Sequence, residues 1–228
     1  MNKKPKLLAV SLVLNAIFII AGIVFFVKGY HVRIIKPYLW NYYLDKVSLF
    51  QDLKDTRGMV VFLGDSLTDR CEWSELFNRR DMLNRGIDAD TSEGVLNRID
   101  DIIALKPKKI FIMIGGNDLN IGKKVPEIEA NYKNIIANIR AGSPLTKIYI
   151  QSLLPTVYKL APLPRSGIKE LNARIRAMAD NVHVLYVDIY SQVIDANGDL
   201  NSEYTRDGVH LNGKGYRAWR RSIDRFIK

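Results

Sequence analysis

After residue 56 the chain alternates between short apolar segments and longer amphipathic ones, a pattern that few folds accommodate. Three of the apolar segments are almost unbroken runs of apolar or β-branched residues, as expected of strands covered on both faces. Regular alternation of strand and helix predicts an α/β fold with a five-stranded parallel sheet and right-handed crossovers. The expected strands are 59–63, 82–84, 109–114, 147–151 and 183–188, and the expected helices are 92–105, 126–140, 166–180 and 213–227.

One segment lies outside this pattern, because residues 7–27 form an uncharged run of 21 residues in which only Ser11 and Asn15 are clearly polar. About 20 helical residues cross the hydrocarbon core of a bilayer, so we expect a transmembrane anchor. The alternatives are a buried helix and a cleaved signal peptide, for which Ala21-Gly22 is a poor cleavage site. The chain then divides into a basic tail (1–6), the anchor (7–27), a juxtamembrane linker and helix (28–57) and the main domain (58–228).

The charges around the apolar run bear on its orientation. Three lysines before it favour a cytoplasmic N-terminus, which places the main domain of a single-pass protein on the extracytoplasmic side. Basic residues after the run reduce the difference in positive charge between its two ends. The aromatic residues that follow can lie at the membrane interface. Alternatively, residues 38–54 form a helix whose aromatic side chains pack on the main domain, and we favour this helix. The aromatic residues are Tyr30, Tyr38, Trp40, Tyr42 and Tyr43.

The composition excludes several classes of protein. A single cysteine, Cys71, rules out an intrachain disulfide and a pair of cysteine metal ligands. The net charge of +10 is compatible with nucleic-acid binding, but no zinc-finger, helix-turn-helix or RNP pattern accompanies it. Much of the excess flanks the apolar run, where cations attract anionic lipid head groups. We therefore expect a lipid partner for residues 7–27 and no nucleic-acid partner.

Residues that can perform chemistry follow the expected strands, at the carboxyl edge where parallel sheets collect their sites. The first strand runs into Gly64-Asp65-Ser66-Leu67-Thr68. This segment places a serine hydroxyl at the sheet edge, although Ser and Asp also cap helices. It lacks the last glycine of G-x-S-x-G, so it is not the nucleophile elbow of the α/β-hydrolases.

A serine nucleophile needs a base, and the chain contains three histidines. His31 adjoins the apolar run and His183 begins a strand, whereas His210 lies in a loop before the last expected helix. Asp207 stands three residues ahead of His210, a spacing that allows the carboxylate to orient the imidazole. A structural hydrogen bond is the alternative for His210, but Ser66 and this pair complement each other.

Acyl transfer also requires donors for the developing oxyanion. The second strand ends at Gly86 and the third leads into Gly115-Gly116-Asn117-Asp118. The Gly86 amide and the Asn117 side chain are suitable neutral donors, although each is also compatible with a plain turn. Asp65 and Asp118 are expected to hold their loops by hydrogen bonds.

Together these segments resemble, in order, the four blocks of the SGNH (GDSL) hydrolases, within residues 58–228. The likeness is greatest to the subgroup of platelet-activating-factor acetylhydrolase catalytic subunits and bacterial acylhydrolases. It implies a flavodoxin-like three-layer α/β/α sandwich with no metal and no cofactor. It also implies a Ser66–His210–Asp207 triad, with oxyanion donors from the Ser66 and Gly86 amides and the Asn117 side chain. It does not extend to residues 1–36.

The resemblance predicts a serine ester hydrolase acting on short-chain or acetyl O-acyl esters of a carbohydrate or lipid. The loop over 153–164 is expected to line the substrate site. Two other functions remain compatible with the same residues: a membrane-tethered O-acyltransferase, in which an acceptor hydroxyl replaces water, and a non-catalytic binding module on the same fold. The sequence does not define the oligomeric state.

Overall fold

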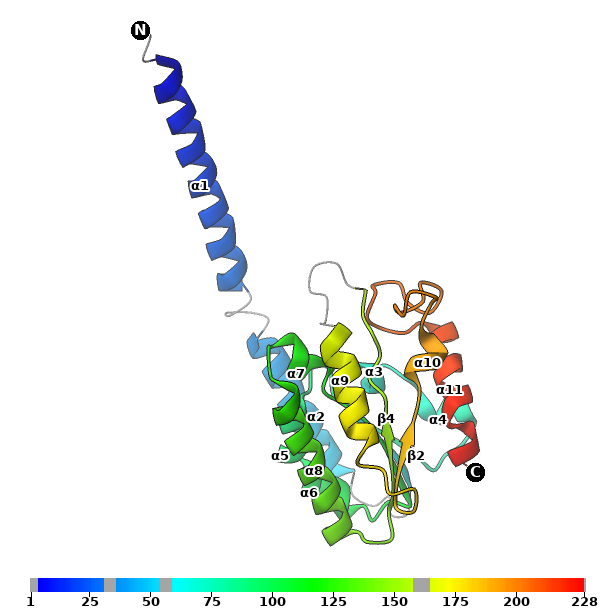
Figure 1. Cartoon of the computed structure of the whole chain (residues 1–228). Coiled ribbons are helices and arrows are strands. Elements are labelled where there is room, and N and C mark those ends of the chain that lie inside the picture. The colour runs from blue at the N-terminus through cyan, green and yellow to red at the C-terminus, as the bar shows by residue number, and fades with distance from the viewer. Residues whose placement is uncertain (1–3, 31–35, 54–58, 158–164, 228) are drawn as a thin grey trace. The chain divides into compact units, whose positions relative to one another are not determined.

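The computed structural model describes residues 4–30, 36–53, 59–157 and 165–227 (Figure 1). The chain separates into two compact units, Met1–Leu44 and Asp45–Lys228. Parts of the expected tail (1–3), linker (31–35 and 54–57) and lining loop (158–164) lie outside the described residues, and so does His31.

The second unit is built on a parallel sheet with the strand order β2-β1-β3-β4-β5. This confirms the predicted five-stranded parallel sheet. The order places β1 and β3 side by side at the centre, so the loops that follow them are neighbours. The strands are β1 (Val60–Gly64), β2 (Met82–Gly86), β3 (Lys109–Met113), β4 (Lys147–Gln151) and β5 (Val184–Val187).

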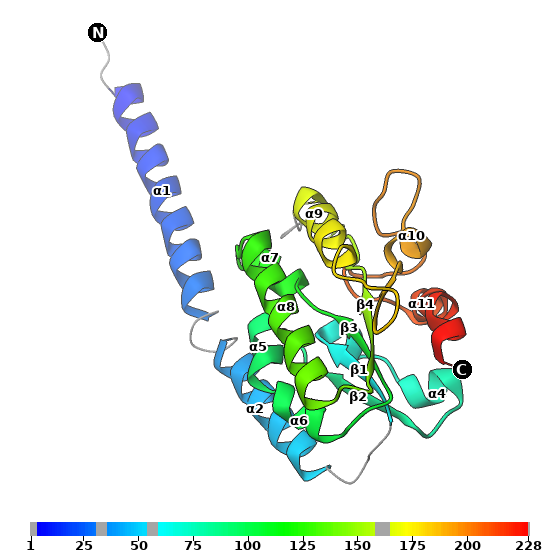
Figure 2. The ribbon, with the colours of Figure 1, turned by 60° about the horizontal axis from the view of Figure 1, so that its bottom comes forward.

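Helices cover both faces of the sheet, as Figure 2 shows. Alternate strand residues point to opposite faces, so Val61 and Leu63 enter one apolar core while Val60 and Phe62 enter the other. The first core is closed by α5 (Ser92–Asn97), α6 (Ile99–Ala104), α8 (Val125–Gly142) and α9 (Arg165–Arg176); the second is closed by α4 (Trp73–Phe77), α10 (Tyr190–Val193) and α11 (Gly213–Ile227).

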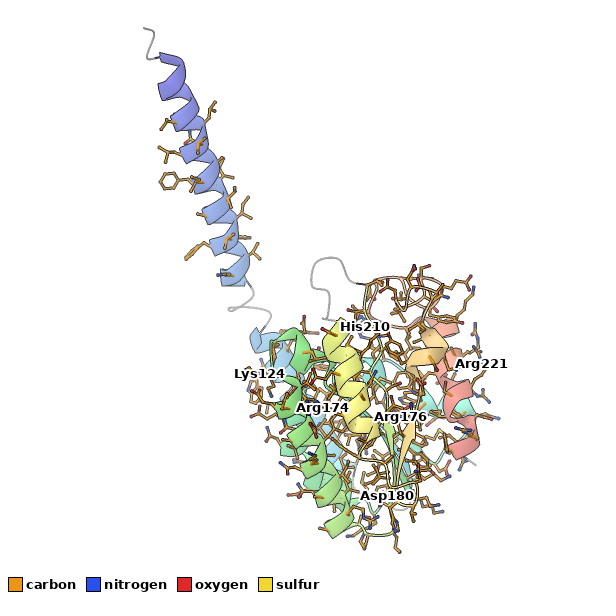
Figure 3. All side chains as sticks on the ribbon, viewed as in Figure 1. Lys124, Arg174, Arg176, Asp180, His210 and Arg221 are labelled. Carbon is orange, nitrogen blue, oxygen red and sulfur yellow. The ribbon has the colours of Figure 1, made fainter. Side chains whose placement is uncertain are left out.

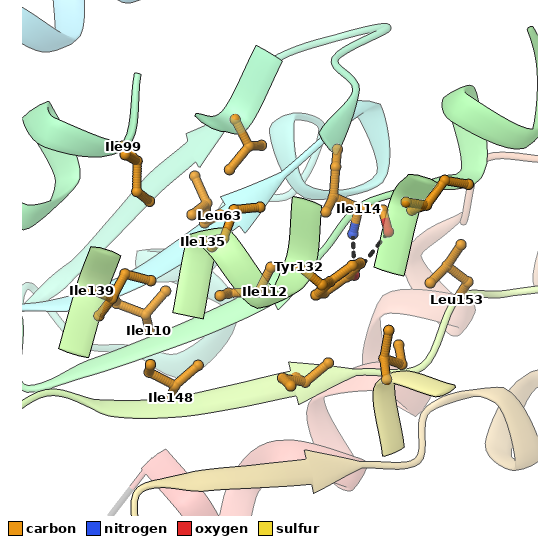
Figure 4. Packing of buried hydrophobic residues seen from close by; sticks show 14 of the residues in the cluster. Leu63, Ile99, Ile110, Ile112, Ile114, Tyr132, Ile135, Ile139, Ile148 and Leu153 are labelled. Atoms are coloured by element: carbon orange, nitrogen blue, oxygen red, sulfur yellow. Dashed lines mark hydrogen bonds between the residues drawn. The ribbon is translucent and has the colours of Figure 1, made fainter. Parts of the chain in front are cut away.

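The first core also fixes the strand end that leads into the site (Figure 4). Tyr132 of α8 is fully buried, and its hydroxyl donates to the Ile114 carbonyl at 2.8 Å and accepts from the Ile114 amide at 3.1 Å. Ile114 directly follows β3. Both polar groups of this buried residue are therefore satisfied at the point where the chain leaves the sheet.

The single helix expected over 92–105 is wrong, because the structure has two helices separated at Arg98. The Arg98 backbone leaves the helical range (φ −119°), and its buried guanidinium bonds the Asp90 carboxylate at 2.8 and 3.0 Å and the Gly64 carbonyl at 3.3 Å. The buried ion pair holds Arg98 toward the sheet, which the apolar periodicity of the segment does not reveal.

The helix expected over 166–180 ends earlier, at Arg176. Asp180 accepts hydrogen bonds from the amides of Val182, His183 and Val184 at 2.7–2.8 Å. These bonds turn the chain into β5, so His183 lies in the turn and not in the strand.

The first unit contains α1 (Lys4–Tyr30) and the beginning of α2 (Lys36–Asp52). Within α1, the stretch Val10–Lys28 is exposed and is long and apolar enough to cross a bilayer. On α2, Tyr38 and Trp40 are exposed by 65% and 59%. The helix expected over 38–54 is present, displaced by two residues at each end.

Candidate active site

Ser66 is the first residue of α3 (Ser66–Asp69), which begins directly after β1. The helix is capped by Asp65, whose Oδ1 accepts from the Leu67 amide at 3.0 Å, so the Ser66 hydroxyl is not the cap. The last residue of β1 is Gly64, and no larger residue fits at this crowded strand end. A Cβ at position 64 would lie 2.3 Å from the Met113 carbonyl oxygen. Ser66 is 8% exposed.

His210 and Asp207 lie beside this serine, although 144 residues separate Ser66 from His210. The His210 Nε2 atom is 3.1 Å from Ser66 Oγ, and His210 Nδ1 is 2.6 Å from Asp207 Oδ2. Figure 3 shows His210 at the opposite end of the domain from Asp180, which precedes β5. The structure thus brings together the serine, imidazole and carboxylate that the sequence singled out.

The second carboxylate oxygen of Asp207 is also bonded. Asp207 Oδ1 accepts from the amides of Val209 and His210 at 2.9 and 2.8 Å. Burial raises the pKa of Asp207, but the hydrogen bonds from the His210 ring and these amides outweigh it and hold the pKa well below its usual value. The carboxylate is therefore ionised at neutral pH and can stabilise a protonated imidazole.

The carboxyl-terminal segment is joined to α3 by a further hydrogen bond. The hydroxyl of Tyr216, on α11, donates to the Leu67 carbonyl at 2.9 Å. The indole of Trp73 donates to the neighbouring Thr68 carbonyl at 3.0 Å. Both bonds satisfy carbonyls of the single turn that carries Ser66.

A cavity of about 440 Å³ opens onto these groups. This volume lies within the range of small-molecule sites. Of the loop expected to line the site, Leu153, Leu154 and Thr156 do so, whereas residues 158–164 lie outside the described residues. The polar lining includes Ser66, Asn117, Asn120, Asp207 and His210, and the apolar lining includes Leu67, Met113, Leu153, Leu154 and Val209.

Asn117 lines the cavity from α7 (Gly116–Asn120), the short helix that follows β3. Gly115 adopts a left-handed conformation (φ +116°) that redirects the chain at this point. The Asn117 Nδ2 atom donates to the Asp90 carbonyl at 2.8 Å. This bond uses one amide hydrogen and fixes the side chain, while the second hydrogen is available to a ligand.

Gly86 has a different environment from the one expected. Its amide donates to Asn84 Oδ1 at 2.9 Å. A Cβ at this position would lie 2.2 Å from the Asp69 amide nitrogen. The glycine thus permits close packing of α3 on β2, and its amide can reach an oxyanion only after releasing Asn84.

Ala89, in the loop after β2, is a further candidate donor that the sequence does not indicate. It has left-handed backbone (φ +61°), and among the described residues its amide has no hydrogen-bond acceptor. The next residue, Asp90, provides the carbonyl that binds Asn117. Glycine is the residue expected at a left-handed position, so an alanine there is not indicated by the sequence.

The other reactive side chains near Ser66 are held in structural roles. Asp118 is buried and accepts from the Ser92 amide and hydroxyl at 2.9 and 2.7 Å. Burial raises the pKa of Asp65 to about 7, partly opposed by its bond from the Leu67 amide. Cys71 is buried, which raises its pKa and leaves the thiol unreactive. Within the described ranges, no cluster of His, Cys, Asp and Glu is suited to a metal ion.

Residues 62–218 match the GDSL-like Lipase/Acylhydrolase family, and the chain belongs to this family. It is accordingly a hydrolase that acts on esters. Among curated proteins, it is 30% identical to platelet-activating factor acetylhydrolase IB subunit alpha2 of Rattus norvegicus, over 72% of this chain and 74% of that one. The bovine alpha1 subunit is 29% identical over 72% and 73%.

Solved structures show the same relationship. A GDSL-like lipase of Bacteroides thetaiotaomicron has a TM-score of 0.67 and 28% identity, covering 83% of this chain and 96% of that one. A Streptococcus pneumoniae protein, described as a candidate platelet activating factor, has a TM-score of 0.80 and 26% identity, with 88% and 99% covered.

Proposed function

We propose that this ester hydrolase uses Ser66 as nucleophile, His210 as general base and acid, and Asp207 as the group that orients and stabilises the imidazole. The continuous hydrogen-bond chain Ser66–His210–Asp207 at the wall of the cavity carries the proposal. Ser66 Oγ attacks the ester carbonyl carbon as its proton passes to His210 Nε2. The same proton then leaves with the alcohol as the C–O bond breaks.

Water completes the cycle. His210 takes a proton from the water as its oxygen attacks the acyl-enzyme, and returns that proton to Ser66 Oγ as the acid leaves. Throughout, Asp207 remains ionised, consistent with its lowered pKa. A transferase would deliver the acyl group to another hydroxyl. Analysis of the products therefore tests hydrolysis, which must yield one free acid for each alcohol released.

The oxyanion is met by neutral donors at the carboxyl edge of the sheet. We propose the Ser66 amide and the free hydrogen of Asn117 Nδ2, which is already fixed by the Asp90 carbonyl. For the third donor the sequence indicated Gly86, whose amide is engaged by Asn84. We propose the Ala89 amide in its place, since its loop adjoins Asn117.

Replacing Asn117 by alanine should lower kcat by about 10²–10³-fold with little change in KM, because the oxyanion donor acts mainly in the transition state. Steady-state kinetics on a soluble acyl ester measure both constants. Asn97→Ala is the matched control, since Asn97 is exposed at the end of α5. An unchanged kcat in Asn117→Ala would remove this residue from the oxyanion site.

The substrate is proposed to be a short-chain or acetyl O-acyl ester of a lipid or carbohydrate. Support comes from the platelet-activating factor acetylhydrolase relatives, whose name describes removal of an acetyl group. The apolar residues of the cavity, among them Met113 and Leu154, suit the hydrocarbon part of such an ester.

We further propose that residues 7–27 remain as a single-pass anchor, followed by the linker (28–57) and the hydrolase domain (58–228) on the extracytoplasmic side. Exposed apolar side chains along Val10–Lys28 support this proposal. The protein should stay in the membrane pellet after alkaline carbonate extraction, and protease added outside intact cells should digest the domain. A soluble product that begins near residue 22 would instead identify a cleaved signal peptide.

A further inference from the structure

The juxtamembrane helix α2 contacts the helix that carries the nucleophile. Lys46 Nζ lies 2.7 Å from Asp69 Oδ1, and the two side chains are 22% and 9% exposed. Asp69 is the last residue of α3, one turn after Ser66. Within the second unit, which begins at Asp45, this charged pair therefore joins α2 to the C-terminal end of α3.

Two further contacts fix this part of α2. The Phe50 ring is buried, and the Arg85 guanidinium on β2 lies 4.6 Å from its centroid. Gln51 Nε2 donates to Asp101 Oδ2, on α6, at 3.0 Å. Lys46 is therefore presented by a segment that is attached to β2 and α6, and it is not a loose surface side chain.

The position of α3 depends on the groups at its ends, because a helix of four residues has no stability of its own. At the beginning, Asp65 caps it. At the end, the Asp69 carbonyl accepts from Asn84 Nδ2 at 2.9 Å, and the Asp69 backbone packs on Gly86. A carboxylate at a helix C-terminus opposes the helix dipole, and a cation beside it offsets this effect.

We propose that Lys46 is a positioning residue, which holds the end of α3 through Asp69 and so sets Ser66 Oγ against His210 Nε2. This proposal rests on the proposed roles of Ser66 and His210. It concerns a part of the chain outside residues 62–218, the family's matched region. The helix that follows the apolar segment in the sequence thereby acts on the nucleophile.

The full-length protein with Lys46→Met should hydrolyse a soluble acyl ester with kcat lowered about tenfold and KM unchanged, since small displacements of a reacting group reduce the rate strongly. The rate of Ser66 labelling by a fluorophosphonate should fall in parallel. Lys46→Arg retains the cation and should retain most of the rate. Lys133→Met is the control, because Lys133 pairs with Glu129 at 2.7 Å on the exposed side of α8.

The charge exchange Lys46→Asp with Asp69→Lys separates positioning from a general loss of structure. It should recover most of the kcat lost in Lys46→Asp alone, because the pair is restored with opposite polarity. An unchanged kcat in Lys46→Met, a change confined to KM, or no recovery in the exchange variant would each overturn the proposal. Absence of Ser66-dependent labelling in the unmodified protein would instead refute the proposed catalytic roles.

Discussion

Replacing Ser66 by alanine should abolish ester hydrolysis, with a fall in kcat on the order of 10⁶-fold. The substitution removes only the hydroxyl oxygen, which lies 3.1 Å from His210 Nε2. Without it, no acyl-enzyme forms, and the remaining donors act only on direct attack by water. The cavity and the polypeptide backbone are retained, so binding of substrate should change little.

This prediction is measured with a series of p-nitrophenyl esters from acetate to octanoate. The unmodified protein should prefer the shorter chains, and Ser66→Ala should be inactive on all of them. Ser191→Ala, an exposed serine on α10, should match the unmodified protein. Fluorophosphonate labelling should likewise require Ser66. If Ser66→Ala kept its activity while folded, the proposed mechanism would be wrong at its first step.

Replacing Asp207 by asparagine should lower kcat by about 10⁴-fold, the effect expected when the carboxylate of such a triad becomes neutral. The side chain keeps its size, but a neutral amide cannot stabilise a protonated imidazole. Its NH₂ group could also donate to His210 Nδ1, which now lies 2.6 Å from Asp207 Oδ2. The His210 ring would then be held in the wrong tautomer for accepting the Ser66 proton.

Asp65→Asn is the matched comparison, because it makes the same chemical change one residue from Ser66. We expect activity within a few fold of the unmodified protein. Activity lost in Asp65→Asn and retained in Asp207→Asn would reverse our assignment of the acid.

The same variant should alter the pH dependence of stability. Because burial raises the pKa of Asp65 from 3.8 to about 7, the folded protein keeps this proton at pH values where the unfolded chain has lost it. The contribution to stability is present below about pH 4 and disappears as the pH rises through about 7. Thermal melting should show this loss in the unmodified protein and a smaller one in Asp65→Asn.

Elements with a regular apolar pattern were the most predictable part of the fold. Both β4 and α11 have the bounds expected from the sequence, because their apolar patterns run from end to end. The short helices α3, α4, α7 and α10 were not predicted, since four or five residues are too few to display a helical period. The break at Arg98 depends on a buried partner, Asp90, that local sequence cannot identify.

The candidate site was predictable where chemistry requires a particular side chain. The candidates for nucleophile and base are few, because a serine follows β1 and an Asp-x-x-His segment precedes α11. Parallel strands bring their carboxyl ends together, so these residues are expected to be neighbours. The oxyanion donors were harder, because any residue supplies a backbone amide. The residue type favours Gly86, but the structure gives its amide a partner, whereas the Ala89 amide has none among the residues that the structure describes.

The hydrogen bond from Tyr216 to the Leu67 carbonyl has a consequence for how the enzyme loses activity. In the proposed mechanism the nucleophile, Ser66, directly follows the first strand and helix cap, and the base lies in the loop before the last helix, so the two ends of the domain must stay docked for turnover. Partial unfolding that releases only the last helix, α11 (Gly213–Ile227), would separate them while most of the sheet persists. On heating, catalysis should therefore fail earlier than the bulk of the secondary structure.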